Sequence, residues 1–203
     1  MNIFTYSLGE LQANCYLIEH DGEAILIDPA DDGGFLLEEL LRKNLHLVGL
    51  LATHGHFDHV MAVGEMQLSF DVPLYLHQKD TFLIQRLTET AEHFLEHRQA
   101  IIPPKHFEFI SSSELEIGNC KLQIIHTPGH TPGSVSYYFP DEKIIFTGDT
   151  LFRGAVGRTD FSYGDKKALR ESLQKLFTLP DEVEVYPGHG ESTFIQEEKK
   201  RVT

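Results

Sequence analysis

Histidine and aspartate side chains are concentrated in one short segment of this sequence. Residues 53–59 read THGHFDH and place His54, His56, Asp58 and His59 within six positions. On an extended backbone His54 and His56 point in the same direction, because side chains alternate with a period of two. Asp58 and His59 fall where a following helix is expected to begin, so the chain bends there and directs them to an adjacent spot. The spacing predicts that each pair binds one of two neighbouring metal ions.

Three further candidate ligands follow predicted strands later in the chain. His130 lies in HTPGHTPG, Asp149 in FTGDT and His189 in PGHG, and each has a glycine next to it or one residue away. Glycine permits the tight backbone turns that such placement requires. Together with the first segment, these residues complete two coordination shells.

The resulting set of donors contains no cysteine and is typical of a catalytic metal centre. Structural zinc sites are usually rich in cysteine and closed, whereas histidine and carboxylate sets with open positions are catalytic. The predicted ligands are His54, His56 and His130 for one ion, Asp58, His59 and His189 for the other, and Asp149 as a bridge between them. Such ligands serve zinc, iron and manganese. We expect two divalent metal ions, with zinc as the first choice and iron or manganese as alternatives.

Other polar residues could support this chemistry. Asp28, at the end of a predicted strand, is either an acceptor that orients a ligand histidine or a turn residue before a proline. Arg153 and Arg158 follow Asp149 closely, and they either bind a carboxylate of the substrate or are exposed structural arginines. Asp58 could be catalytic as well as a ligand, by orienting a hydroxide nucleophile.

Rigid elements must position these side chains, and the hydrophobic pattern predicts strands mixed with helices. In two pairs of similar segments, 50–56 with 124–130 and 24–30 with 144–150, a strand ends in a polar loop that carries His or Asp. Such loops gather chemistry at one crevice of a sheet. We expect strands at 14–19, 23–28, 47–52, 73–76, 121–125, 134–139, 143–147 and 182–186, and helices at 35–43, 60–70, 81–99 and 165–177. This order predicts two sheets packed together with helices outside, in a single domain over residues 1–203.

Composition limits the classes of partner. Among 203 residues, 17 Lys and Arg stand against 31 Asp and Glu, a formal net charge of −14. This balance argues against a nucleic acid partner, which is bound through clustered basic residues. The longest nearly uninterrupted apolar stretch, residues 45–52, is far shorter than a membrane span. With no signal-like segment at the N-terminus, we expect a cytoplasmic protein that acts on a small molecule.

The motifs NCYLIE, IDPA, THGHFDH, HTPGHTPG, GDTLFRGAVGRTDF and YPGHG, in this order, resemble the metallo-β-lactamase superfamily and, within it, glyoxalase II-like short-form hydrolases. The resemblance implies an α+β fold, a four-layer αβ/βα sandwich of two mixed sheets. It places the seven ligand positions of the family on the same seven residues. It also implies that the helical C-terminal domain, which binds glutathione in full-length glyoxalase II, is absent.

The leading hypothesis is a dinuclear metal-dependent hydrolase of a thioester such as S-lactoylglutathione or a related acyl-thiol, with a metal-bridged hydroxide as nucleophile. A thiol has a pKa of about 8.5 and leaves as thiolate without a strong general acid. One alternative is a mononuclear iron persulfide dioxygenase of the same superfamily, which GRTDF also resembles, with His54, His130 and Asp149 as ligands. A second alternative is a non-catalytic metal-binding protein.

Overall fold

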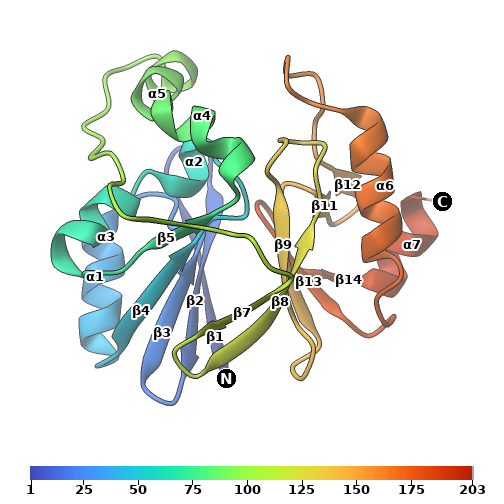
Figure 1. Ribbon diagram of the computed structural model, residues 1–203, viewed down its shortest axis with the longest axis horizontal. Coiled ribbons are helices and arrows are strands. Elements are labelled where there is room, and N and C mark those ends of the chain that lie inside the picture. Colours follow the sequence, from blue (N-terminus) through green and yellow to red (C-terminus); the bar gives the residue numbers. More distant parts are fainter. Residues whose placement is uncertain (203) are drawn as a thin grey trace.

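Two six-stranded sheets pack face to face in the computed structural model, which describes residues 1–202 (Figure 1). The first sheet has the order β1-β2-β3-β4-β5-β6; β1 to β3 are antiparallel, and β3 to β6 are parallel. Its strands are β1 (Asn2–Leu8), β2 (Ala13–His20), β3 (Glu23–Ile27), β4 (His46–Leu51), β5 (Leu74–Leu76) and β6 (Phe107–Phe109).

The second sheet has the order β14-β13-β10-β9-β8-β7, and within it only β10 and β13 pair in parallel. Its strands are β7 (Glu114–Ile117), β8 (Cys120–His126), β9 (Val135–Phe139), β10 (Ile144–Gly148), β13 (Glu184–Pro187) and β14 (Thr193–Phe194). A small ribbon of β11 (Leu151–Phe152) and β12 (Ala155–Val156) follows β10.

Helices cover the outer side of each sheet (Figure 1). The helices beside the first sheet are α1 (Gly33–Arg42), α2 (Phe57–Val60), α3 (Val63–Ser69), α4 (Thr81–Gln85) and α5 (Leu87–Leu95). Those beside the second are α6 (Lys166–Leu176) and α7 (Ile195–Val202). The four-layer sandwich of the metallo-β-lactamase fold predicted from the sequence is therefore confirmed. Within the described residues, none of the helices combines the length and apolar character that crossing a bilayer requires.

The central core lies between the two sheets. Ile25 and Leu51 of the first sheet pack in one buried cluster with Tyr137 and Phe146 of the second. The opposite faces of the same strands contact the helices, and for this reason β2 and β3 are apolar along most of their length rather than alternating. Sheets fixed on both faces hold their edges rigidly, which is what a metal centre at such an edge requires.

Two predicted helices are wrong in their extent. The helix expected over residues 60–70 is divided into α2 and α3, because the N–H groups of Met61 and Ala62 bond to the carbonyls of Ala30 and Pro29 instead of continuing the helical pattern. The helix expected over 81–99 is interrupted at Arg86 and ends at Leu95.

Candidate metal centre

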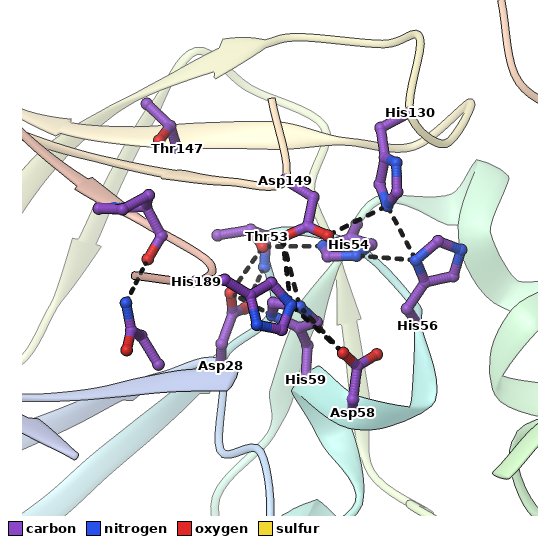
Figure 2. Close-up of polar contacts among 12 residues, drawn as sticks. Asp28, Thr53, His54, His56, Asp58, His59, His130, Thr147, Asp149 and His189 are labelled. Atoms are coloured by element: carbon purple, nitrogen blue, oxygen red, sulfur yellow. Dashed lines mark hydrogen bonds and ion pairs between the residues drawn. The ribbon is translucent and has the colours of Figure 1, made fainter. Parts of the chain in front are cut away.

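Strands of both sheets end at one edge of the sandwich, and the candidate ligands follow these ends. His54 and His56 come after β4, and His130 comes after β8. Asp149 and His189 follow β10 and β13, whose parallel pairing brings their carboxyl ends side by side. Backbone hydrogen bonds, such as that of 2.8 Å from Val135 N to Thr53 O, tie the two sheets together at this edge. The seven predicted ligand side chains therefore converge (Figure 2).

Three imidazoles and one carboxylate form the first group of the cluster. His56 Nδ1 lies 3.1 Å from His54 Nε2 and 2.9 Å from His130 Nε2. Asp149 Oδ2 lies 3.4 Å from His130 Nε2. These four donor atoms face one another closely enough to share one metal ion.

A second group lies on the other side of Asp149. Asp58 Oδ2 is 3.4 Å from His189 Nε2 and 3.7 Å from His59 Nε2. Asp149 Oδ1 is 3.4 Å from the same His59 nitrogen and 3.8 Å from His189 Nε2. The two oxygens of Asp149 are thus divided between the two groups, as a bridging carboxylate requires.

Hydrogen bonds on the outer side of the rings determine which nitrogen of each histidine faces the cluster. Four histidines have such a partner: His59 Nδ1 with Asp28 Oδ2 at 3.0 Å, His54 Nδ1 with Thr53 Oγ1 at 3.1 Å, His130 Nδ1 with the Arg158 carbonyl at 2.9 Å, and His56 Nε2 with the Tyr163 hydroxyl at 2.8 Å. A carbonyl or carboxylate only accepts, so the ring nitrogen beside it carries the proton. The other nitrogen of the same ring then presents its lone pair to the cluster.

Two buried polar atoms in this cluster have no hydrogen-bond partner, namely His59 Nε2 and Asp149 Oδ1. Burial without a partner is costly for such atoms. They face each other at 3.4 Å, and a divalent cation beside them would satisfy both. A side chain at Gly188 would close this space, since a Cβ there would lie 2.2 Å from Asp149 Oδ1. The residues present therefore fit divalent metal ions.

Charges within the cluster separate its histidines into two kinds. Burial lowers the pKa of His54 well below its ordinary value, and the neighbouring His59 lowers it further. Burial, followed by the charge of an adjacent imidazole, lowers the pKa of His56 to about 3. Burial also acts to lower the pKa of His59, but Asp58 and Asp149 outweigh it and raise that pKa to about 10. The rings of His54 and His56 are therefore neutral and can donate a lone pair. Between Asp58 and Asp149, in contrast, a positive charge is favoured, and a metal ion there would replace the proton of His59.

Two residues that the sequence analysis did not single out support the cluster. Tyr163 bonds to His56, as described above. Asp80 is fully buried, and its carboxylate accepts hydrogen bonds from Gly55 N at 2.9 Å, Gly133 N at 2.7 Å and the Thr131 hydroxyl at 2.6 Å. It thereby links the loop of His54 and His56 to that of His130. Neither residue belongs to a local pattern that would have identified it.

A cavity of about 500 Å³ opens over the cluster and is lined by residues of both groups of candidate ligands. Arg158 also lines it, and its Nε and Nη2 donate hydrogen bonds of 2.7 and 2.6 Å to Asp160. Arg153, in contrast, lies outside the lining of this cavity and forms an ion pair with Glu191. Both arginines considered as anion anchors already have a carboxylate partner.

The fold and the histidine–aspartate cluster define a class of protein, and a family model identifies it. The model described as the metallo-beta-lactamase superfamily matches residues 8–189. The chain belongs to this superfamily, which includes metal-dependent hydrolases. The resemblance noted in the sequence is thereby confirmed.

Individual relatives match the chain over nearly its whole length. It is 38% identical to the hydroxyacylglutathione hydrolase GloC of Haemophilus influenzae, covering 98% of this chain and 96% of that protein. Among solved structures, TTHA1623 in a di-iron-bound form is 38% identical with a TM-score of 0.90, covering 98% of each chain. The BLEG-1 B3 metallo-beta-lactamase is 35% identical, also with a TM-score of 0.90, covering 98% of this chain and 97% of that one.

Proposed function

We propose that this protein is a single-domain, dinuclear metal-dependent hydrolase of thioesters, such as S-lactoylglutathione or a related acyl-thiol. The observation that carries the proposal is the division of the Asp149 oxygens between two groups of donors, one of which contains two buried atoms without partners. The relationship to GloC, named a hydroxyacylglutathione hydrolase, supports the choice of substrate.

In this proposal the seven clustered side chains hold two divalent ions. The ligands are His54, His56 and His130 for the first ion, Asp58, His59 and His189 for the second, and Asp149 for both. When bound, the ions supply Lewis acidity, which activates a water molecule as nucleophile and polarises the thioester carbonyl. We expect zinc, with iron or manganese as alternatives, and the di-iron form of TTHA1623 shows that a related chain holds iron.

The residues of the chain orient the reactants. Asp58 lines the cavity, where its carboxylate can accept a hydrogen bond from the attacking water and fix its direction. Asp28 keeps the proton of His59 on Nδ1, so that Nε2 stays available as a donor atom. The thiol of the substrate leaves as thiolate, and no residue is needed to protonate it.

Metal analysis combined with turnover tests the function. We expect two metal ions per chain and hydrolysis of S-lactoylglutathione in the absence of oxygen, faster than that of any β-lactam offered as an amide substrate. One iron per chain, with oxygen uptake on glutathione persulfide and no hydrolysis, would instead establish the dioxygenase alternative. Bound metal with no turnover of these compounds or of any other thioester, charged or neutral, would establish a non-catalytic metal-binding protein.

The bridging role of Asp149 predicts the result of its removal. Asp149→Ala should lose bound metal and turnover together, by more than about a hundredfold, because a ligand contributes more than a residue that only supports one. Asp141→Ala, at an exposed position, is the control and should match the wild type. Turnover of Asp149→Ala at the wild-type rate would contradict the assignment.

A further inference from the structure

We infer that the cavity above the metal centre selects neutral thioesters with an apolar acyl chain over the anionic thioesters of glutathione. The inference rests on the proposed thioester hydrolysis and specifies its substrate class. It is drawn from the apolar lining of the cavity and from the pairing of the cations around it.

Several apolar side chains that line this cavity are exposed and lie outside the hydrophobic core. Leu11, Phe94 and Val156 line it, although they are 43%, 46% and 37% exposed. Exposed large apolar residues that gather around one concave site indicate a ligand, since each of them gains from being covered. Phe152 adds a further ring to the lining.

Ring contacts hold one wall of the cavity in place. Phe161 and Tyr163 stack with centroids 5.3 Å apart and an interplanar angle of 15°. Phe82 meets Tyr163 edge to face, at a centroid distance of 5.3 Å. Phe94, which also lines the cavity, stacks on Phe57 at a centroid distance of 5.9 Å. A wall of rings fixed by one another binds an apolar chain with little loss of side-chain entropy.

The cations near the cavity already have carboxylate partners. Arg158 is the one Lys or Arg residue in its lining, and it bonds to Asp160 through two nitrogens while lying 4.4 Å above the Phe161 ring. In the adjoining groove, Arg86 bonds to Glu89 in the same manner, at 3.3 and 3.0 Å. Each of these arginines is matched by an acid two or three residues further along the chain.

A glutathione thioester has two carboxylates and one ammonium group. Its carboxylates would have to compete with Asp160 or Glu89 for a cation, in a chain whose formal net charge is −14. A neutral thiol portion avoids this competition, and an apolar acyl chain covers the exposed rings and aliphatic side chains.

The test compares thioesters that share an acyl group and differ in the charge of the thiol. We expect kcat/KM for S-hexanoyl-N-acetylcysteamine to exceed that for S-hexanoylglutathione by about tenfold or more. The free energy lost when one substrate carboxylate finds no cation corresponds to roughly a tenfold change in kcat/KM. Within the N-acetylcysteamine series, kcat/KM should rise from acetyl to hexanoyl by up to about fourfold per methylene.

A variant that adds a positive charge to the cavity lining tests the role of charge directly. Val156→Lys should raise kcat/KM for S-hexanoylglutathione and lower it for the neutral ester, so that the preference shrinks severalfold. Leu41→Lys is the control, because Leu41 is 69% exposed on the outer helix α1, and it should leave the preference unchanged.

The outcomes separate this inference from the function on which it rests. If no thioester is hydrolysed, the proposed function fails. If glutathione thioesters are hydrolysed as well as their neutral counterparts, or if chain length has no effect, the inference is overturned while thioester hydrolysis stands.

Discussion

The partner of each histidine ring determines how firmly its donor atom is oriented. His59 and His130 each donate to an oxygen that can only accept, a carboxylate and a backbone carbonyl. Thr53 donates its own hydroxyl proton to Asp28 and therefore accepts from His54. His56 differs, since its partner is the hydroxyl of Tyr163, a side chain that also lines the cavity.

This difference leads to a prediction for Tyr163→Phe. The variant keeps the ring that packs on Phe161 and loses only the hydroxyl beside His56 Nε2. We expect its affinity for the metal to fall about tenfold, the lower end of the range for residues that orient a ligand. Competition with a chromogenic chelator measures this affinity. Tyr186→Phe removes a hydroxyl that contacts Glu184, and it should leave the affinity unchanged.

At the scale of elements, Asp80 fixes the relative position of two loops that carry candidate metal ligands. It stands in the short turn between β5 and α4, and its oxygens accept from Gly55, Thr131 and Gly133. Burial raises the pKa of Asp80, and the three hydrogen bonds oppose that rise. Both loops donate hydrogen bonds to the Asp80 carboxylate, so its role depends on having two oxygens that accept.

Asp80→Asn should therefore destabilise the fold although it preserves shape. The amide group must turn an N–H donor toward at least one donor of a loop, which leaves buried groups unpaired and costs about 2–4 kcal/mol. Chemical denaturation gives the free energy of unfolding. Asp141→Asn, at an exposed position, should be neutral, and equal stability of the two variants would contradict this role.

Glu39 links helix α1 to strand β1 and predicts a dependence of stability on pH. Hydrogen bonds from Arg42, then from Tyr6 of β1, lower the pKa of Glu39 from 4.5 to about 2. The folded chain therefore binds this proton less readily than the unfolded chain. The stabilisation is present above about pH 4.5 and is lost as the pH falls toward 2.

Unfolding free energies measured between pH 7 and pH 2 check this sign. The difference between the wild type and Glu39→Gln should shrink as the pH falls through that window. Glu38→Gln changes an exposed neighbour on the same helix, and its curve should run parallel to that of the wild type. A constant gap for Glu39→Gln would show that its contacts are not charge-dependent.

At the scale of the whole molecule, the candidate metal centre lies where the two halves of the sandwich meet. One half supplies the residues of the loop after β4 and of helix α2, and the other supplies His130, Asp149 and His189 (Figure 2). Metal that binds the folded chain and not the unfolded one stabilises the fold in proportion to the logarithm of its concentration over its dissociation constant.

Removal of metal should therefore lower the melting temperature. At a metal concentration about a hundredfold above Kd the stabilisation is about 2.7 kcal/mol, which corresponds to about 5–10 °C for a chain of this size. Differential scanning calorimetry before and after dialysis against a chelator measures the shift, and added Zn²⁺ should reverse it. Asp149→Ala should show a much smaller shift, and an equally large one would contradict the proposed ligand set.

A structural feature could be predicted from the sequence when the residues that determine it lie close together along the chain. Buried strands such as β3 and β4 were recognisable from their apolar runs, and the family motifs predicted the fold. The half-exposed strand β1 has no such run, and it was not predicted. The division between α2 and α3 depends on carbonyls about thirty residues earlier in the chain, which a helical pattern does not reveal.

The amino-acid sequence by itself determined the donor types and their placement after strands, because ligand chemistry resides in the side chain and local spacing. Only the tertiary structure decided that Asp80 and Tyr163 support the cluster, and that the backbone carbonyl of Arg158 orients His130. The partners of Asp80 lie up to 53 residues away, and Tyr163 lies 107 residues from His56. Contacts over such separations follow from how the sheets pack, and no local pattern of residues records them.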